Sequence, residues 1–527
     1  MDYIIVQAGG KGTRLGYLTK NKPKALTPVE NLPMIFHLFR KYPDKRFVII
    51  ADYKKDVLHK YLECFADVKY QVVDATGTGT CSGVKQSIDL IPEGRSFMLV
   101  WSDLILPEGF KLPEGYDGDS AKDATQESLK KCPDRDYVGI SATFDCRWKF
   151  ENGKFVEERS TEHGVAGFFL FRDKSVIEDV PESGELVRWM QGKELKFEEI
   201  SLAGTREFGL LEEYEKLGKT KTRPFNRITV DGDVLTKEPV DDQGRKLAKR
   251  ESAWYQKAKD KGIKGLPIIY ETSPSIKMEF IKGKNIYDCN YGYEDKKRIL
   301  TSLVETLKNL HESESVPADS FSMREAYYNK TMQRLSKIQM LVPFAMDDYV
   351  KVNGRRCRNV FYHRDELEKA LEKLRCDKFK FIHGDCTFSN LMIRDNGEPV
   401  LIDPRGYFGF TEIFGDERYD WAKLYYSIVG NYDRFNLKNF TLDIGGHSIV
   451  DGELIKSIGS DEVRLSIESN GWEDMEKDFF ELTGADKDEI KLLHAVIWLS
   501  LTTYAWQDYD SICGSFYNGL YYLEEVL

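Results

Sequence analysis

Residues 381–405 read FIHGDCTFSNLMIRDNGEPVLIDPR, and this stretch decides the fold of the C-terminal half of the chain. Two short apolar runs, 379–382 and 400–402, have the length and composition of β-strands. The Asp-Asn-Gly sequence at 395–397 is a strong turn signal. The stretch therefore predicts strands joined by loops and a hairpin, with acidic residues placed where the strands end.

Three polar residues of this stretch have the spacing that metal-assisted phosphoryl transfer needs. Asp385 and Asp403 each follow one of the predicted strands, and Asn390 lies five residues after Asp385. One carboxylate can orient a substrate hydroxyl as a base, while the amide oxygen and the second carboxylate hold Mg²⁺ on nucleotide phosphates. An isolated His-Gly-Asp usually only punctuates a hairpin, but the combined spacing is much rarer by chance.

The His-Gly-Asp motif ending at Asp385, with Asn390 and Asp403 at their spacing, resembles the phosphotransferase family of aminoglycoside, choline and methylthioribose kinases. The likeness covers roughly the C-terminal half of the chain. It implies a two-lobed, protein-kinase-like α+β domain that phosphorylates a small alcohol with ATP. It also implies that Asp385 is the catalytic base and that Asn390 and Asp403 bind Mg²⁺.

The bulk properties are those of a folded enzyme with more than one domain. The chain has 527 residues, 41% hydrophobic and 31% charged, and a formal net charge of −11 that argues against binding nucleic acid. Its nine cysteines form no Cys-x-x-Cys pair, which favours reduced thiols over disulfides or a zinc site. No signal peptide and no apolar run of membrane-spanning length is apparent. We expect a cytoplasmic protein without membrane insertion, and its oligomeric state is not readable.

The N-terminal part opens with a buried-type strand, 3–6, that leads directly into the glycine-rich loop 7–15 (QAGGKGTRL). Without Cβ atoms the backbone can approach a nucleotide closely, and its N–H groups can point at the phosphates. The loop fits neither the P-loop nor the dinucleotide-binding spacing. Arg14 and Lys24, ten residues apart, can clamp a triphosphate and neutralise the charge that develops on cleavage. Either residue alone would more often be a solvated surface charge.

Together, GGKGTRL from Gly9 and KPKALTPV from Lys22 resemble the sugar-phosphate nucleotidylyltransferase family, which includes the phosphocholine cytidylyltransferases. The likeness covers roughly residues 1–215 and implies that a phosphate monoester is joined to an NTP with release of pyrophosphate. It further implies that Arg14 and Lys24 contact the triphosphate. The other nucleotide-binding residues that we take from it are Gly9, Gly10, Gly12, Thr13, Gly79 and Thr80.

Buried strands at 47–50 and 97–100 alternate with amphipathic helices, which predicts a doubly wound, mostly parallel α/β sheet with ligands at the carboxyl ends of its strands. By resemblance, Asp103 is a Mg²⁺ ligand. Glu207 falls where the family has a second metal ligand in an Asp-x-Gly motif, and a position on a helix surface remains an alternative. The segment 76–83 is either a second nucleotide-contacting loop or a flexible turn.

A polar, basic segment that ends in a proline predicts a domain boundary near residue 220. The expected parts are a nucleotidylyltransferase domain at 1–218, a linker at 219–224, and a kinase domain at 225–527 with lobes at about 225–283 and 284–527.

In a kinase-like N-lobe, a strand lysine held by a helix glutamate contacts the nucleotide phosphates. Lys237 and Glu251 are the candidates, although Glu251 lies in a highly charged helix and a solvated position is nearly as good an interpretation. Backbone groups near Glu279 and Ile281 are expected to meet the adenine.

Three further residues of the kinase-like part are interpreted from their positions in the sequence. His311 ends a helix predicted over 294–311, and a helix-terminal position is the simpler interpretation. Asp420 is interpreted as an N-cap-like residue. Arg405 can pair with a phosphate, with an acidic substrate or with a neighbouring carboxylate, and we slightly favour the structural pairing.

Residues 315–375 contain no usable motif, and the C-terminus is rich in aromatic residues. These aromatics can form a cage for a quaternary amine, but core packing is the more frequent outcome of such a pattern. They are Trp498, Tyr504, Trp506, Tyr509, Phe516, Tyr517, Tyr521 and Tyr522.

A kinase makes a phosphate monoester and a nucleotidylyltransferase consumes one, so the simplest expectation is a bifunctional enzyme for two successive steps. Its partners would be ATP, a second NTP with CTP favoured over UTP, GTP or dTTP, a small alcohol and the phosphate ester of that alcohol. The product would be CDP-choline, a CDP-polyol or a nucleotide sugar for a surface polymer. The alternatives are a kinase half metabolically unrelated to its neighbour, and one half that is inactive and regulatory.

Overall fold

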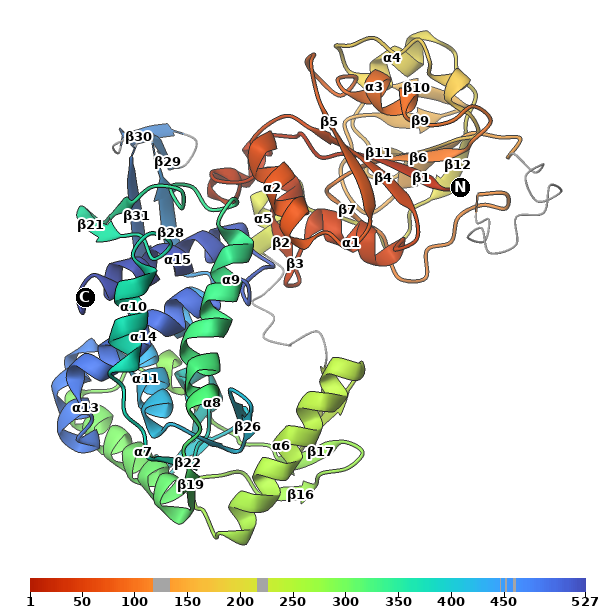
Figure 1. Ribbon diagram of the computed structural model, residues 1–527. Helices are drawn as coiled ribbons and strands as arrows, with labels where there is room; N and C mark the ends of the chain where they lie inside the picture. The colour runs from red at the N-terminus through yellow and green to blue at the C-terminus, as the bar shows by residue number, and fades with distance from the viewer. Residues whose placement is uncertain (117–132, 216–225, 446, 451–452, 458–460) are drawn as a thin grey trace. The chain divides into compact units, whose positions relative to one another are not determined.

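A computed structural model describes residues 1–116, 133–215, 226–445, 447–450, 453–457 and 461–527 of the protein (Figure 1). The predicted linker, 219–224, lies outside these residues. The chain divides into two compact units, the first built mainly from the chain up to Gly218 and the second mainly from the chain after it. None of the helices in the described parts of the chain is long and apolar enough to cross a membrane.

The first unit is organised around a nine-stranded sheet. Its parallel part has the order β6-β1-β4-β5, and Gln7 at the end of β1 lies opposite Ile50 of β4 and Trp101 of β6. The carboxyl ends of these strands are therefore level. The parallel strands are β1 (Tyr3–Gln7), β4 (Arg46–Ala51), β5 (Lys69–Asp74) and β6 (Phe97–Trp101).

A long buried strand, β11 (Gly164–Phe171), pairs antiparallel with β6 and extends the sheet. The α/β prediction is confirmed, with antiparallel pairing confined to the strands around β11. The remaining strands of the sheet are β8 (Tyr137–Ser141), β9 (Lys149–Glu151), β10 (Lys154–Val156) and β12 (Glu198–Ser201). The helices of the unit are α1 (Met34–Lys41), α2 (Lys55–Phe65), α3 (Val84–Asp89), α4 (Leu186–Gly192) and α5 (Leu211–Glu215).

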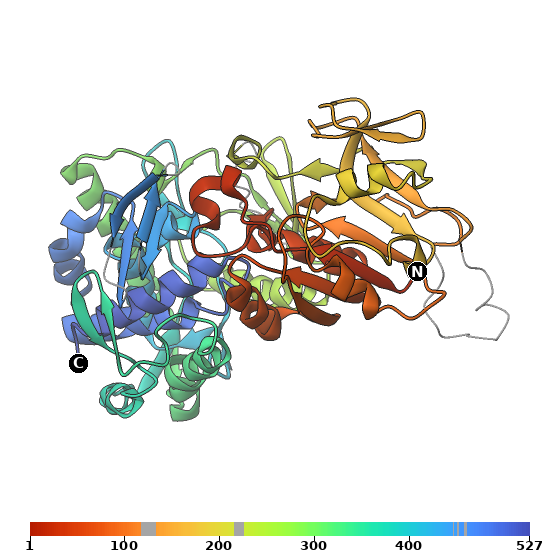
Figure 2. The same ribbon diagram turned by 90° about the horizontal axis from the view of Figure 1, so that it is seen from above.

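The central strands form here because their sequences are continuously apolar, as strands covered on both faces require. Ile4 to Val6 and Phe97 to Val100 are fully buried, and helix α3 contributes Val84 and Ile88 to the same core. Figure 2 shows this sheet in the red to orange part of the chain, with its helices beside it.

The second unit has a two-lobed α+β architecture. Its smaller lobe is a four-stranded antiparallel sheet of order β14-β15-β17-β16 with one long helix, α6 (Asp242–Asp260). The strands are β14 (Asn226–Asp231), β15 (Val234–Pro239), β16 (Ile269–Glu271) and β17 (Ile276–Glu279).

The larger lobe is mainly helical, with short sheets at its surface and beside α7. Its longer helices are α7 (Tyr293–Ser313), α9 (Lys330–Ile338), α10 (Arg364–Glu372), α11 (Glu417–Ile428), α13 (Glu476–Thr483), α14 (Lys487–Leu501) and α15 (Tyr509–Leu523). Its main strands are β20 (Tyr349–Val352), β21 (Arg355–Arg358), β22 (Lys378–Phe381), β23 (Leu391–Ile393), β24 (Pro399–Leu401), β28 (Phe440–Ile444) and β31 (Glu462–Ile467).

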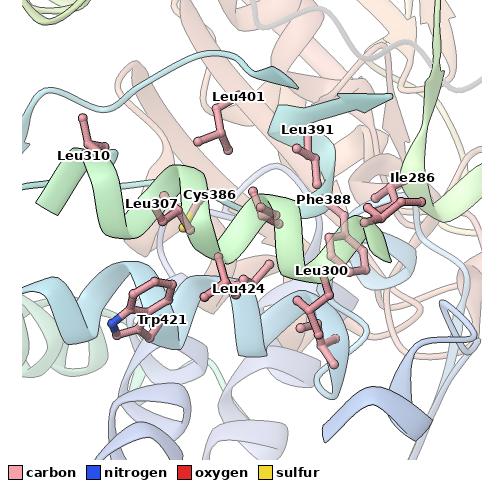
Figure 3. Close-up of a cluster of buried hydrophobic side chains, with 14 of the residues drawn as sticks. Ile286, Leu300, Leu307, Leu310, Cys386, Phe388, Leu391, Leu401, Trp421 and Leu424 are labelled. Carbon is pink, nitrogen blue, oxygen red and sulfur yellow. The ribbon is translucent and has the colours of Figure 1, made fainter. Parts of the chain in front are cut away.

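Helix α7 is the centre of this lobe (Figure 3). Its leucines at 300, 307 and 310 face both the hairpin β23–β24, which contributes Leu391 and Leu401, and helix α11, which contributes Trp421 and Leu424. The hairpin turns at Gly397, whose φ of +82° is one that L side chains rarely adopt. The strand–loop–hairpin prediction is thus confirmed, and the hairpin is fixed against the main helix of the lobe.

Candidate active sites

The glycine-rich loop leaves β1 at the carboxyl end of the parallel sheet, where ligands bind in open α/β folds. A Cβ on Gly9 would lie 2.7 Å from the Cβ of Asp52, the residue that follows β4. Gly12 has a φ of +63°, and a Cβ on it would lie 3.1 Å from the Cβ of Lys24. The loop thus passes too close to its neighbours for side chains at these positions. Gly10 and Thr13, by contrast, are exposed.

Three charged side chains meet beside this loop. Lys24 Nζ forms an ion pair with Asp103 Oδ2, and it lies 3.8 Å from Glu207 Oε1. Asp103 follows β6, while Glu207 ends the short strand β13 (Arg206–Glu207), which pairs antiparallel with β7 (Leu104–Ile105). Glu207 therefore reaches the cluster from a strand, and its alternative position on a helix surface is wrong.

The electrostatics of the cluster suit a divalent cation. Burial, followed by the charge of Asp103, raises the pKa of Glu207 to about 7. Burial also opposes the charge on Asp103, but Lys24 outweighs it and lowers the pKa of Asp103. Asp103 Oδ1 is buried and has no hydrogen-bond partner in the described part of the chain. Two adjacent carboxylates with an unsatisfied oxygen are a donor set that fits Mg²⁺.

Arg14 is exposed, and its charge lies close enough to the cluster to lower the pKa of Glu207. Gly79 and Thr80 are held by a different segment. Thr80 Oγ1 accepts the Leu186 N–H at 2.8 Å, and a Cβ on Gly79 would lie 2.4 Å from the carbonyl oxygen of Gly184. Both residues therefore have contacts that hold their loop against Gly184 and Leu186.

Gly209→Ala is expected to lower nucleotidyl transfer by about 100-fold, the cost of misplacing a reacting group by about 1 Å. A Cβ at this position would lie 1.8 Å from Glu207 Oε1 and would push that carboxylate away from Asp103 and Lys24. Pyrophosphate release measures the effect. Gly192→Ala is the matched control, because a Cβ there has no atom within 4 Å. Equal rates for the two variants would show that the position of Glu207 does not matter.

In the second unit, a lysine joins two carboxylates from different elements. Lys237 Nζ on β15 lies 2.7 Å from Glu251 Oε2 on α6 and 2.8 Å from Asp403 Oδ1 after β24. Burial opposes the charge on Lys237, but the two carboxylates outweigh it and raise its pKa. Glu251 is only 5% exposed, so the solvated position that the sequence left open is wrong.

Asp385 and Asn390 lie in the loop between β22 and β23. Asn390 Nδ2 donates to the backbone carbonyl of Asp385 at 2.8 Å. The backbone carbonyl of Asn390 accepts the N–H of Ile402, the residue before Asp403, at 3.0 Å. Lys423 Nζ lies 3.0 Å from Asp385 Oδ1. The amide of Asn390 and the carboxylate of Asp403 are oxygen donors of the kind that hold Mg²⁺ together with substrate phosphates, so these residues fit the ion.

No group of three or more His, Cys, Asp or Glu side chains that could hold a metal ion occurs among the described residues.

Several polar groups around residues 279–281, where we expect the adenine to bind, already have hydrogen-bond or ion-pair partners within the protein. The N–H groups of Glu279 and Phe280 bond to Ile268 and Asp233 at 2.8 Å each, and the Glu279 carboxylate forms a two-point ion pair with Arg394. Ile281 is 7% exposed. The Glu279 side chain therefore has a structural partner.

Asp420 holds the loop that carries Asp385, and its interpretation as a cap is wrong. The N-cap of α11 is Asp416, whereas Asp420 is fully buried and accepts the N–H groups of His383 at 2.8 Å and Gly384 at 2.7 Å. His311 Nε2 lies 2.9 Å from the same carboxylate. His311 is thus a buried partner of this loop. The sequence feature that could have indicated this role is a histidine near a helix end, His311, together with an aspartate, Asp420, that follows the His-Gly-Asp motif.

Asp420→Ala is expected to lower the free energy of unfolding by about 3–5 kcal/mol, because His311 and two backbone N–H groups lose a buried partner. Burial opposes the charge on Asp420, but the hydrogen bond with His311 outweighs it and lowers the pKa of Asp420. The stabilisation is therefore present above the usual pKa of an aspartate and is lost as the pH falls through the folded value. Urea unfolding at pH 7 and pH 3 measures both effects. Asp365→Ala, on the exposed first turn of α10, is the control, and an equal shift for both variants would contradict this role.

A cavity of about 60 Å³ opens beside Asp385, and no sequence motif marks most of the residues that line it. It is lined from α9, α11 and α14 and from the loop at Arg405. Arg405 Nη1 donates to the Tyr419 hydroxyl at 2.9 Å, and its charge faces the Asp385 carboxylate. Of the C-terminal aromatics, Tyr504 lines the cavity, while Trp498 is fully buried in the core.

Each unit thus contains one cluster in which a lysine joins two carboxylates. Residues 3–113 match the family described as Nucleotidyl transferase, and residues 226–423 match the Phosphotransferase enzyme family. The chain therefore contains one region that matches each of these two family models, and neither match covers half of the chain.

Individual relatives match only parts of the chain. Over 111 residues it is 31% identical to the bifunctional protein GlmU of Methanocaldococcus jannaschii, covering 20% of this chain and 26% of the relative. Over 62 residues it is 36% identical to the UTP–glucose-1-phosphate uridylyltransferase AglF of Haloferax volcanii, covering 11% of this chain and 26% of the relative. The chain thus spans about a quarter of the length of these curated relatives. The solved structure of choline kinase LicA from Streptococcus pneumoniae is 14% identical and covers 58% of this chain and 92% of that chain, with a TM-score of 0.36.

Proposed function

We propose that the second unit phosphorylates a small alcohol with ATP, and that the first unit joins the resulting phosphate ester to an NTP. The product is an NDP-activated building block for a surface polysaccharide or lipid. The observation that carries the proposal is the presence in one chain of the Lys237–Glu251–Asp403 cluster and the Lys24–Asp103–Glu207 cluster.

In the kinase step, the alcohol oxygen forms a bond to the γ-phosphorus of ATP, the bond to the β-phosphate oxygen breaks, and ADP leaves. Asp385 accepts the hydroxyl proton and orients the hydroxyl. Lys237, held by Glu251, contacts the nucleotide phosphates. Asn390 and Asp403 would hold Mg²⁺ in this site, and Asp103 and Glu207 in the other. When bound, the ion neutralises the charge of the phosphate oxygens.

In the nucleotidyl step, an oxygen of the phosphate ester forms a bond to the α-phosphorus of the NTP, and pyrophosphate leaves. Arg14 and Lys24 neutralise the charge on the phosphates as that bond breaks. The backbone at Gly9, Gly10 and Gly12 lets the nucleotide approach. CTP is the nucleotide that we test first, because the motifs at Gly9 and Lys24 resemble those of phosphocholine cytidylyltransferases. UTP is the second, because AglF is a uridylyltransferase by name.

The test is incubation of the protein with ATP, one of CTP, UTP, GTP or dTTP, and each member of a panel of alcohols, with mass detection of products. We expect ADP and one NDP-linked product that requires ATP, and that still forms without ATP when the phosphate ester is supplied. Formation of ADP without any NDP-linked product would contradict the coupling of the two steps. Formation of neither from any alcohol or ester would contradict both assignments.

A further inference from the structure

The cavity beside Asp385 is strongly cationic. Four of its lining side chains are basic, namely Lys330, Arg334, Arg405 and Lys423, whereas Asp385 is the one carboxylate among the lining residues of the described chain. Lys330 and Arg334 are four residues apart on α9 and therefore share a face. A π-helical turn, Glu325–Asn329, directly precedes Lys330. Such turns inside helices occur frequently at functional sites.

The hydrogen bonds of three of these cations go to neutral groups in the described part of the chain, and the carboxylate that faces Arg405 is that of Asp385. Lys330 Nζ lies 3.4 Å from the Tyr407 hydroxyl, and Arg405 Nη1 lies 2.9 Å from the Tyr419 hydroxyl. Arg334 Nη1 donates to the backbone carbonyl of Ser500 and, at 3.0 Å, to its hydroxyl. Like charges gathered in a half-buried site repel one another unless an anion lies between them.

The pKa values of Lys330 and Arg334 report this repulsion, whereas burial of Lys423 and Arg405 is outweighed by neighbouring groups, Asp385 among them, that raise their pKa values. Burial, followed by the positive charge of Arg405, lowers the pKa of Lys330 to about 8. Burial and Arg405 also lower the pKa of Arg334. An anion in the cavity would reverse both effects, because an opposite charge within about 4–6 Å favours the charged form.

The nucleotide does not supply this anion. Lys237, Asn390 and Asp403, which mark the side of the nucleotide phosphates, are not among the lining residues. Asp385 lines the cavity and is also the proposed base, so the cavity lies on the side from which the acceptor hydroxyl reaches Asp385. The tyrosines at 419, 426 and 504 line the same space and can pack against a short carbon skeleton.

We infer that the acceptor of the kinase unit is an acidic alcohol, whose carboxylate or phosphate group is bound by Lys330, Arg334 and Arg405 while its hydroxyl meets Asp385. The inference rests on the proposed kinase function and names its substrate class. Choline and other quaternary amines are disfavoured, because their charge would face four cations. We therefore propose an acidic alcohol, and not a choline-like alcohol, as the acceptor.

The first experiment compares diols that differ in one group. Isothermal titration calorimetry of the full chain is performed with glycerate, glycerol 3-phosphate, glycerol and (2,3-dihydroxypropyl)trimethylammonium. We expect glycerate or glycerol 3-phosphate to bind at least about tenfold more tightly than glycerol, and the trimethylammonium compound not to bind. Whichever of the two acidic compounds binds more tightly shows whether the site prefers a carboxylate or a phosphate.

The second experiment removes the charges. Lys330→Met and Arg334→Met are each expected to weaken the acidic diol about tenfold and to leave glycerol unchanged. Lys337→Met is the matched control, because Lys337 is exposed on the same helix and does not line the cavity. This pattern separates a contact with the ligand from a structural role, which would weaken both diols.

The third experiment uses pH. With a pKa of about 8, Lys330 is charged at pH 7 and mostly neutral at pH 9, so the affinity for the acidic diol should fall up to about tenfold over this range. The groups that face Lys330 are Arg405, Arg334 and Tyr407. Arg405 lowers the pKa of Tyr407 to about 8, and the phenolate acts in the same direction. Lys330→Arg should make the affinity for the acidic diol nearly independent of pH over this range. Tyr407→Phe measures how much of the fall in affinity comes from ionisation of the Tyr407 phenol.

Two results would overturn the inference: binding of the trimethylammonium compound as tightly as glycerate, or no binding of either acidic diol. The kinase assignment is judged separately by ADP release. ADP formed only with glycerol or the trimethylammonium compound would keep the kinase and reject the acidic acceptor. Binding of acidic diols that the two Met variants weaken, with no ADP from any alcohol, would keep the anion site and reject the kinase.

Discussion

Asp385→Asn is expected to slow phosphoryl transfer to the alcohol by about 10²–10⁴-fold, the usual contribution of a positioned base. The amide cannot accept the hydroxyl proton, and it removes the negative charge that Lys423 faces at 3.0 Å. The loop itself should persist, because Asn390 bonds to the backbone carbonyl of residue 385 and not to its side chain. ADP release measures the loss, and NDP-product formation from a supplied phosphate ester should stay unchanged.

Asp395→Asn is the matched control for this variant, because Asp395 is exposed in the turn of the β23–β24 hairpin. It should retain full kinase activity. If Asp385→Asn kept at least a tenth of the rate, Asp385 would not be the base. If it abolished nucleotidyl transfer as well without unfolding the protein, the two sites would not be independent.

Asp103→Asn is expected to lower nucleotidyl transfer by about 10³-fold and to leave the kinase step intact. Asp103 forms the ion pair with Lys24, and its Oδ1 atom is buried without a hydrogen-bond partner in the described chain. A metal ion held there is worth several kcal/mol of charge stabilisation, and each 1.36 kcal/mol is a factor of ten in rate. Asparagine removes the charge and leaves Lys24 to pair with Glu207 alone. Pyrophosphate release with CTP or UTP and a phosphate ester measures the effect.

The control is Asp89→Asn, at the exposed end of α3. A Mg²⁺ titration of the Asp103→Asn variant adds a second readout, because a lost ligand should raise the concentration of Mg²⁺ that half-saturates activity. An unchanged rate and an unchanged Mg²⁺ requirement would remove Asp103 from the site. The same titration of Asp385→Asn should show no change in the Mg²⁺ requirement.

The fold was predictable from sequence because it depends on local patterns. Continuous apolar runs such as 3–6 and 97–100 predict strands covered on both faces, and the turn at 395–397 fixes a hairpin. The candidate residues are also local to such patterns, since Asp103 and Asp403 each lie two residues after the end of a strand. Asp103 lies beside Lys24, and Asp403 lies beside Lys237, because the strands that precede the two aspartates end at these places in the two units.

Other parts of the sites were not predictable. Asp420 has the position of a helix cap, but its carboxylate bonds to backbone N–H groups 37 and 36 residues away. Lys330 and Arg334 have the spacing of a solvated helix face, and no motif marks them. Which face of α9 turns inwards depends on how α11 and α14 pack, which is a property of the assembled lobe.

The sequence by itself therefore determined that this chain contains two phosphate-handling transferase domains, because their motifs combine strand ends, glycines and charges within short stretches. Only the tertiary structure decided the charge of the cavity beside Asp385. Its charge comes from α9, α11 and the Arg405 loop, which are up to about a hundred residues apart in the chain and meet only when the helices pack. Electrostatic interaction depends on distance in space and on burial, and neither quantity can be read from the order of residues.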